Sequence, residues 1–177
     1  MPKRILILDC SGAGKSTLAR ALQAKLELPI IHLDQHYWKP NWVESTKEEW
    51  ETNVQELIAG DEWIMDGNYG GTLDIRIPRT DTIIFLDVST WTCLYRVTRR
   101  IFKYWGKVRP DMTEDCVERF DLEFLHYVLM YNFTRRKSLI KKLKGLGKDK
   151  NVFILKSSDE IDKVLNQKSA ERFKTQH

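Results

Sequence analysis

A short stretch near the N-terminus combines residue types that bind phosphate. The apolar residues 5–8 lead into a loop that ends in Gly14-Lys15-Ser16-Thr17, and helix-forming residues follow directly. An apolar strand, a glycine-bearing loop and a helix in this order are typical of a P-loop, whose main-chain N–H groups and helix N-terminus surround an anion. The sequence therefore predicts a site for nucleotide phosphates, and the residues expected to line it are Ser11, Gly12, Ala13, Gly14, Lys15, Ser16 and Thr17.

The end of this loop predicts chemistry on a nucleoside triphosphate bound with Mg²⁺. Lys15 is expected to reach the β- and γ-phosphates and to act in catalysis, and the Ser16 hydroxyl to be one ligand of Mg²⁺. ATP is the expected nucleotide, with GTP as the alternative. One residue departs from the usual pattern, because Asp9 stands six positions before the lysine, where a P-loop has glycine. Its carboxylate either repels the triphosphate or points away from the loop, and both alternatives stay open.

Two further acids each close an apolar run, where a strand is expected to end. Asp66 stands where P-loop enzymes place an acid that holds Mg²⁺, and we expect it opposite Ser16. A simple Asp-Gly turn is the alternative, and Asp87 is a rival for the metal role. Asp34 is expected to orient the hydroxyl group of an acceptor and to take its proton, with an ordinary turn aspartate as the alternative.

The acceptor site is expected beside Asp34. Trp38 and Trp42 either form a stacking wall for a planar or sugar-like acceptor or only seat a helix pair on the core. The turn with Asn68 and Tyr69 is expected to complete the site. Arg76 follows this turn, and its guanidinium is expected to bind an anionic group of the acceptor in a bidentate manner.

A basic run without an acid follows the fourth expected strand. Its members are Arg96, Arg99, Arg100, Lys103, Lys107 and Arg109. Arginines that close over a transferring phosphoryl group stabilise its charge, so Arg96, Arg100 and Arg109 are expected to act in catalysis from a lid at about residues 100–113. A solvated helix face is the alternative for the other members.

A second basic stretch lies between residues 135 and 150. Arg135 and Arg136 at its start are expected to reach back to the nucleotide. Its lysines are expected to lie on a solvated helix face, with contact to nucleic acid as the less favoured alternative. The sequence shows no helix-turn-helix or other nucleic-acid reader.

Five apolar runs alternate with helical patterns along the chain. Strands are expected at residues 5–8, 30–34, 62–66, 81–87 and 151–155, and helices at 17–26, 45–58, 92–104, 113–143 and from 158. Ser45 with Glu48 is typical of a capping box, and Thr113 is expected to cap the long helical region. The alternation predicts an α/β fold, a three-layer α/β/α sandwich around a five-stranded parallel sheet. We expect one domain over residues 1–177, with a helical insertion at about 35–60 that holds the acceptor.

Composition excludes several classes of protein. The chain has 177 residues, of which 42% are hydrophobic, and a formal net charge of +4, so it can form a core and its charge alone does not indicate nucleic acid. No apolar run is long enough to span a membrane, and the three unpatterned cysteines indicate neither disulfides nor a zinc site. We expect a soluble cytoplasmic protein, monomeric or homodimeric, with a loose tail from about residue 170.

The order of these motifs resembles one family. The phosphate loop, Leu33-Asp34 before Trp38-x-Pro40-x-Trp42, the stretch Asp66-Gly67-Asn68-Tyr69 and Arg109-Pro110-Asp111-Met112 are similar to those of adenylate-kinase-like P-loop proteins known as DNA topology modulation (FlaR-like) proteins. The resemblance covers roughly residues 3–156. It implies ATP binding, a five-stranded parallel sheet of the nucleoside or nucleotide kinase type with a short lid, and kinase activity, but it does not give the acceptor. We expect transfer of the γ-phosphoryl group of ATP to a nucleotide, nucleoside or other hydroxylated metabolite. A nucleotide-dependent DNA-binding or regulatory protein is the alternative.

Overall fold

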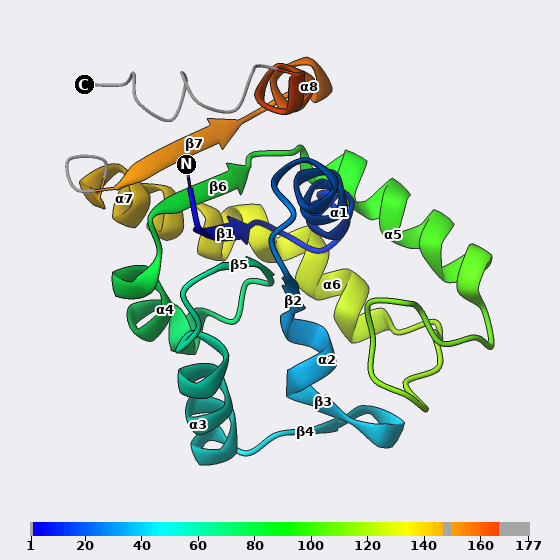
Figure 1. Cartoon of the computed structure of the whole chain (residues 1–177). Coiled ribbons are helices and arrows are strands. Elements are labelled where there is room, and N and C mark those ends of the chain that lie inside the picture. The colour runs from blue at the N-terminus through cyan, green and yellow to red at the C-terminus, as the bar shows by residue number, and fades with distance from the viewer. Residues whose placement is uncertain (1, 147–149, 167–177) are drawn as a thin grey trace.

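The computed structural model describes residues 2–146 and 150–166 and is built on a parallel sheet of five strands (Figure 1). The strands lie in the order β2-β5-β1-β6-β7, which puts β1 at the centre. Their bounds are Arg4–Leu8 for β1, Ile30–His32 for β2, Trp63–Asp66 for β5, Thr82–Leu86 for β6 and Asn151–Leu155 for β7. The predicted five-stranded parallel sheet is therefore confirmed.

Helices cover both faces of this sheet, because the side chains of each strand alternate between two cores. Ile5 and Ile7 of β1 belong to one core, which also holds residues of α1 (Lys15–Leu26), α5 (Thr90–Tyr104) and α6 (Leu122–Tyr131), and α8 (Ser158–Asn166) packs against it. Leu6 and Leu8 belong to the other core, with α3 (Lys47–Leu57), α4 (Leu73–Arg79) and α7 (Lys137–Leu146). The three-layer α/β/α sandwich is confirmed.

The segment between β2 and β5 differs in detail from the prediction. The expected strand to residue 34 ends at His32, and Asp34 lies in the first turn of the short helix α2 (Leu33–Tyr37). A hairpin of β3 (Trp38–Lys39) and β4 (Val43–Glu44) follows, joined by the 3₁₀ turn Pro40–Trp42. The capping box of α3 forms one residue later than predicted, between Thr46 and Glu49, whose side chains each accept the other's backbone N–H.

The segment from residue 105 to residue 121, called here the connecting segment, links α5 to α6. Part of the expected lid, residues 100–104, belongs to α5, and the helix predicted from Thr113 begins only at Leu122, after its N-cap Asp121. Two isolated bridges, Trp105 with Glu118 and Val108 with Val117, hold this segment in a loop, and Asp115 adopts a positive φ of 62°. The long helical region is further divided by a π-helical turn, Asn132–Arg136.

None of the described helices has both the length and the apolar character needed to cross a membrane. The expected loose tail from about residue 170 lies outside the described residues.

Candidate functional site

The phosphate loop leaves β1 and enters α1 at the carboxyl end of the sheet, where α/β folds bind ligands. Gly14 is the N-cap of α1, with a φ of 106°, and Gly12 has a φ of 86°, so both need a residue without Cβ. A Cβ on Gly12 would lie 2.5 Å from the carbonyl oxygen of Cys93, which shows how closely α5 packs on the loop. The first-turn N–H groups of α1 and the positive end of its dipole therefore face the expected phosphate position.

Lys15 and Asp9 occupy the base of this loop. The Lys15 ammonium donates to the main-chain carbonyls of Asp9, at 3.0 Å, and Cys10, at 2.8 Å. Asp9 is buried, with a φ of 153° that favours glycine, and its Oδ2 accepts from the N–H of Val88 at 3.4 Å. Burial raises the pKa of the Asp9 carboxyl to about 7. The acid thus points into the protein toward the end of β6, and near neutral pH it exchanges between the neutral and charged forms.

Asp66 ends β5 beside the phosphate loop. Its Oδ1 lies 2.9 Å from Nδ1 of His32, and its buried Oδ2 has no hydrogen-bond partner in the described part of the chain. Burial alone would lower the pKa of His32, but the hydrogen bond and charge of Asp66 outweigh it and raise that pKa. An orphaned carboxylate oxygen at this place fits a hydrated Mg²⁺ held mainly by phosphates and water. Within residues 2–146 and 150–166, no cluster of three His, Cys, Asp or Glu side chains forms a metal cage.

Ser16, the other expected Mg²⁺ ligand, touches the connecting segment. Its Oγ donates to Oδ2 of Asp111 at 3.0 Å. Burial would raise the pKa of Asp111, but the neighbouring charge of Arg109 and this hydrogen bond bring it below its usual value. An anionic carboxylate therefore lies on the hydroxyl that is predicted to bind the metal ion.

Arg100 and Arg109 are held by acids that lie beyond the basic run. Nε of Arg109 lies 2.6 Å from Oε2 of Glu118, and both side chains are buried. Arg109 also donates to both carboxylate oxygens of Asp111 at 3.2 Å, and Arg100 donates to Glu118 at 3.2 Å. Residues 96–109 contain no acid, as the sequence shows. The fold, however, brings the carboxylates of Asp111 and Glu118, which follow this run, against its arginines.

The other candidate arginines are in different surroundings. Arg96, which is exposed, donates to the carbonyl of Ala13 at 3.0 Å and so lies against the phosphate loop, while its catalytic role stays a prediction. Arg136 forms two hydrogen bonds to Asp87, at 2.5 and 2.6 Å, and its predicted contact with the nucleotide stays a prediction. Asp87, the rival candidate for the metal role, thus orients an arginine. The guanidinium of Arg135 lies over the ring of Tyr127, 5.1 Å from its centroid.

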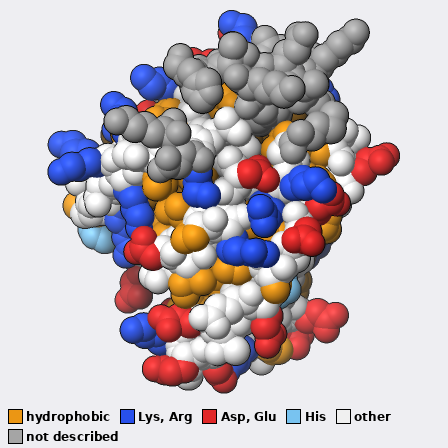
Figure 2. Space-filling view, turned by 60° about the vertical axis from the view of Figure 1, so that its left-hand side comes forward, with side chains coloured by type: hydrophobic (Ala, Val, Ile, Leu, Met, Phe, Trp, Pro, Cys, Tyr) orange, Lys and Arg blue, Asp and Glu red, His pale blue; other side chains and the backbone are white. Residues whose placement is uncertain are grey.

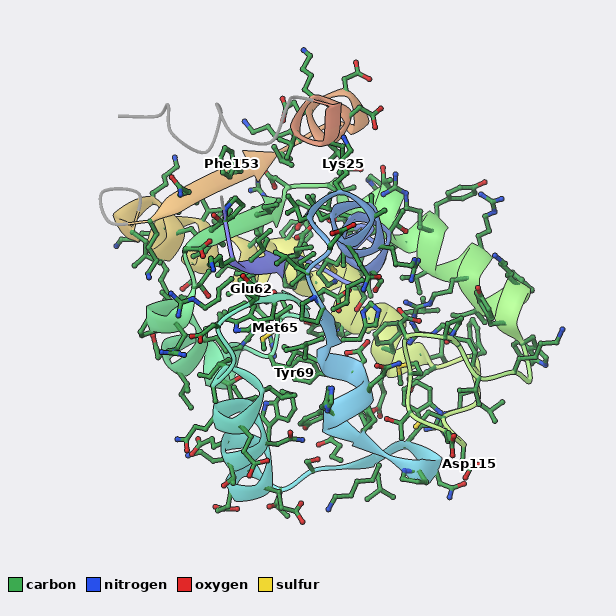
Figure 3. The ribbon with its side chains drawn as sticks, viewed as in Figure 1. Lys25, Glu62, Met65, Tyr69, Asp115 and Phe153 are labelled. Carbon is green, nitrogen blue, oxygen red and sulfur yellow. The ribbon has the colours of Figure 1, made fainter. Side chains whose placement is uncertain are left out.

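The acceptor side is formed by aromatic rings around Asp34. Its Oδ1 accepts a hydrogen bond of 2.7 Å from the hydroxyl of Tyr69, which lies between α2 and α3 (Figure 3). The ring of Tyr37 contacts those of Trp50, at a centroid distance of 5.1 Å, and Tyr69, at 4.7 Å. Burial and the charge of Asp34 raise the pKa of Tyr69, so its hydroxyl stays protonated and orients the carboxylate.

Trp38 and Trp42 pack edge to face with each other, their centroids 5.3 Å apart. Both side chains are half-buried, and Nε1 of Trp42 donates to the carbonyl of Val117 at 2.9 Å. The Thr113 hydroxyl also donates to the carbonyl of Trp38, at 2.6 Å. These contacts join the hairpin to the connecting segment, so the two tryptophans form part of the wall between these segments.

Arg76 is placed differently from the expectation. Its guanidinium is fully buried and donates to the carbonyls of Gly67, at 3.0 Å, Asn68, at 2.6 Å, and Tyr69, at 2.9 Å. Burial lowers the pKa of this group. The Arg76 guanidinium therefore fixes the turn at residues 67–69 from within the core and is not exposed to an acceptor. Asn68 in that turn donates to the hydroxyl of Tyr131 at 2.9 Å, and its Oδ1 is buried without a partner in the described chain.

The second basic stretch is mostly paired within the chain. Lys142 forms an ion pair with Asp74, and Lys150 donates to the carbonyl of Thr80 at 2.6 Å. Lys148 lies outside the described residues. Figure 2 shows blue and red side chains intermixed on the face turned toward the viewer. This arrangement does not favour the nucleic-acid alternative.

Sequence reasoning missed three residues of the site. His32 lies in a predicted strand and has no predicted role at the site. Asp111 belongs to one motif of the family resemblance, and Glu118 lies in a predicted helix. A signal existed for one of them, because Asp111 follows Arg109 by two residues, a spacing that permits a local ion pair. The contacts of His32 and Glu118 depend on segments distant in the sequence or on the loop conformation.

Comparisons with known proteins find similarity in sequence to a curated protein and similarity in fold to solved structures. No family model matches the chain. A curated relative, the uncharacterized protein YqaC of Bacillus subtilis (strain 168), is 30% identical over 108 residues, which are 60% of this chain and 61% of that protein. The matched part of the chain thus spans about three fifths of that relative's length.

Two solved structures share the arrangement of elements. A putative kinase from Chloroflexus aurantiacus J-10-fl has a TM-score of 0.54 at 15% identity, and the match covers 93% of this chain and 95% of that one. The shikimate kinase from Bacteroides thetaiotaomicron has a TM-score of 0.54 at 19% identity, with the same coverage of 93% and 95%. At this level of identity the likeness concerns the fold alone, a five-stranded parallel sheet covered by helices on both faces.

Proposed function

We propose that this protein is a P-loop kinase that transfers the γ-phosphoryl group of MgATP to a small hydroxylated acceptor. The observation that carries the proposal is the convergence at one end of the sheet. The amide-lined loop with Lys15 follows β1, Asp66 with its orphaned oxygen ends β5, and Asp34 follows β2. Nucleotide, metal and acceptor functions thus meet at the carboxyl ends of three adjacent strands.

The phosphate loop is the proposed site of the triphosphate. The ammonium of Lys15 leaves two neutral carbonyls to contact the β- and γ-phosphates, and the first-turn N–H groups of α1 bind phosphate oxygens. Ser16 and Asp66 are the proposed ligands of Mg²⁺, directly or through water. The metal ion neutralises charge on the phosphates when it is bound. His32 orients the carboxylate of Asp66 through the contact between its Nδ1 and Oδ1 of Asp66.

The acceptor is proposed to bind against Asp34. The hydroxyl of Tyr69 occupies one oxygen of this carboxylate, which fixes its orientation and leaves the second oxygen for an acceptor hydroxyl group. In-line attack needs the acceptor proton to leave late in the reaction, and a carboxylate within hydrogen-bond distance takes it. Arg76 supports this arrangement indirectly, because it fixes the backbone that carries Tyr69.

Arg96, Arg100 and Arg109 are the proposed electrostatic groups. Arg96 lies on the loop already, whereas Arg100 and Arg109 are bound to Glu118 and Asp111. A phosphate offers the same bidentate geometry as a carboxylate, so these guanidinium groups are able to exchange one partner for the other as phosphate binds.

An acceptor screen coupled to ADP release tests the proposal. The purified chain is given MgATP and a panel of nucleosides, nucleoside monophosphates and hydroxy acids. We expect one class to stimulate ADP release, Lys15→Ala to abolish the stimulation, and Asp34→Asn to abolish it while MgATP binding is retained. A chain that binds MgATP normally but shows no acceptor-stimulated ADP release with any member of the panel contradicts the kinase proposal.

A further inference from the structure

The outer face of α5 carries large apolar side chains that the fold leaves in solvent. Trp91, Tyr95 and Phe102 are 76%, 67% and 74% exposed. They are four and seven residues apart, which places them on one side of the helix. Nothing within the described ranges 2–146 and 150–166 covers them.

The opposite face of the same helix already fills the core. Cys93, Val97 and Ile101 are buried against the sheet. The helix is thus apolar on two sides, although the fold of one chain needs only the inner one. A helix that is apolar on both sides normally has a partner on each.

The helix beside α5 repeats this pattern. Leu122 at the start of α6 is 71% exposed, and Phe133, just beyond its end, is 72% exposed. These two residues are eleven positions apart, close to three helical turns, so they share one face. Together with Trp91, Tyr95 and Phe102 of α5 they define what we call the α5/α6 face.

The two helices run antiparallel and side by side. Nδ2 of Asn132 lies 2.5 Å from Oγ1 of Thr90, which joins the end of the α6 region to the first residue of α5. Trp91 directly follows Thr90, and Phe133 directly follows Asn132. Both aromatic residues therefore lie at the same end of the helix pair. Farther along, the guanidinium of Arg100 lies over the ring of Phe124, 5.6 Å from its centroid.

The area of this face matches that of a stable interface. An aromatic side chain presents ~150–250 Å², so four rings that are about three-quarters exposed present on the order of 400–700 Å² of apolar surface. A standard interface buries about 800 Å² on each partner, and in homodimers about 65% of it is apolar, roughly 500 Å². The α5/α6 face alone supplies that amount.

We propose that the α5/α6 face binds a second copy of this chain, so that two pairs of antiparallel helices form a four-helix interface about a two-fold axis. An antiparallel helix pair is suited to such an axis, because each α5 can pack against the α6 of the other copy. The flanking charges agree with this pairing: α5 contains no acid and exposes Arg99 and Lys103 beside the stripe, whereas α6 exposes Glu123. When α5 of one copy packs against α6 of the other, these opposite charges complement each other, which favours a second copy of the chain as the partner.

This inference goes beyond the proposed function and does not depend on it. Arg96 and Arg100 leave α5 toward the phosphate loop and the connecting segment, away from the exposed stripe. Dimerisation through the α5/α6 face therefore leaves the candidate site open in both copies.

Sedimentation velocity of the full chain tests the proposal. We expect a species of about twice the 20.9 kDa chain mass. Loading over about 1–100 μM resolves a micromolar dissociation constant. Trp91→Lys and, separately, Phe102→Lys should weaken the dimer about 30-fold or more, because buried aromatic anchors dominate such interfaces. Both side chains are exposed in the single chain, so the melting temperature of the monomeric variants should be close to that of a surface control.

Val43→Lys is the matched control, since Val43 is 54% exposed on β4, far along the chain from this face, and its substitution should leave the dimer intact. A wild-type chain that is monomeric over the whole range overturns the proposal. So does a dimer that persists unchanged in both α5 variants. A monomer that binds vesicles of anionic phospholipid through Trp91 would instead assign the face to a membrane surface and also overturn it.

Discussion

The phosphate loop and the connecting segment both carry cations toward the candidate site, but they hold these cations in different ways. In the phosphate loop, the ammonium of Lys15 rests on two main-chain carbonyls. In the connecting segment, Arg109 is bound to the carboxylates of Glu118 and Asp111. Carbonyl dipoles leave the charge of Lys15 uncompensated, whereas the charge of Arg109 is neutralised by its neighbours. An incoming anion gains full attraction from the first and has to compete for the second.

The two regions, if they bind phosphate as proposed, therefore do so by different physical means. The phosphate loop depends on backbone shape, since its N–H groups and the dipole of α1 are fixed by glycines at positive φ. The connecting segment depends on exchange between ion pairs. A preformed site binds phosphate without rearrangement. Exchange of an ion pair, in contrast, couples phosphate binding to a movement of the segment that carries the pair.

The largest expected effect tests the fixed side of this comparison. Lys15→Ala removes the single ammonium that neutralises transferring charge in the loop, so we expect acceptor-stimulated turnover to fall about 1,000-fold or more. The matched control is Lys25→Ala, in the last turn of the same helix, which should change turnover less than about twofold. Steady-state kinetics give both numbers. A loss below tenfold for Lys15→Ala would mean that the loop is not the phosphate site.

The second prediction tests the exchanged side through stability. Glu118→Gln keeps the shape of the side chain but leaves the buried Arg109 without its closest carboxylate, so we expect the free energy of unfolding to fall by about 3 kcal/mol. Glu123→Gln on the exposed surface of α6 should change it by less than about 0.5 kcal/mol. Chemical denaturation of both variants measures the difference. Equal stability of the two variants would show that the ion pair contributes little to holding the segment.

The same comparison explains what the sequence could predict. The five strands of the parallel sheet follow from apolar runs that alternate with helical patterns, whereas their order in the sheet does not. The loop around Gly14-Lys15 is recognisable because it requires particular residue types at particular backbone positions. The three layers follow from the unbroken apolar strands, such as Ile83 to Leu86, which need cover on both faces.

Contacts between distant segments could not be read in this way. The helix predicted from Thr113 fails because the buried pairing of Glu118 with two arginines outweighs local helix propensity. Arg76 looks like a free anion-binding group in the sequence, yet it lies in the core, where its two terminal nitrogens donate to three carbonyls. Asp34 was placed in a strand because α2 has only five residues, too few to show a helical period.

The third prediction concerns Asp9, the acid within the fixed loop. Because its pKa is raised to about 7, the side chain is mostly neutral at pH 6 and mostly charged at pH 8. Although the carboxylate faces Val88, its negative charge forms at the base of the phosphate loop as the pH rises, so the affinity for MgATP should fall about tenfold over this interval. Asp9→Asn, which keeps the shape and loses the titration, should show a much flatter pH profile in isothermal titration calorimetry.

Asp9→Gly separates charge from backbone strain. Both variants remove the carboxylate, but only glycine adopts the φ of 153° without strain. If Asp9→Gly binds MgATP more tightly than Asp9→Asn at pH 8, backbone strain adds to the electrostatic effect. Parallel pH profiles for the wild-type chain and for Asp9→Asn would show that the carboxylate points away from the phosphates and does not influence them.

The smallest expected effect lies where the two regions meet, at the hydrogen bond between Ser16 and Asp111. The carboxylate of Asp111 occupies the hydroxyl that is proposed to bind Mg²⁺, so nucleotide binding has to displace it. Asp111→Asn keeps a hydrogen bond but loses the charge, and we expect the dissociation constant of MgATP to fall about threefold, the size of one weakened hydrogen bond. Asp115→Asn, an exposed acid in the same segment, is the matched control and should leave the constant unchanged. A dissociation constant that rises in Asp111→Asn would reverse the argument, since Asp111 would then assist binding of the metal–nucleotide complex, and the connecting segment would recognise it through a carboxylate as well as through arginines.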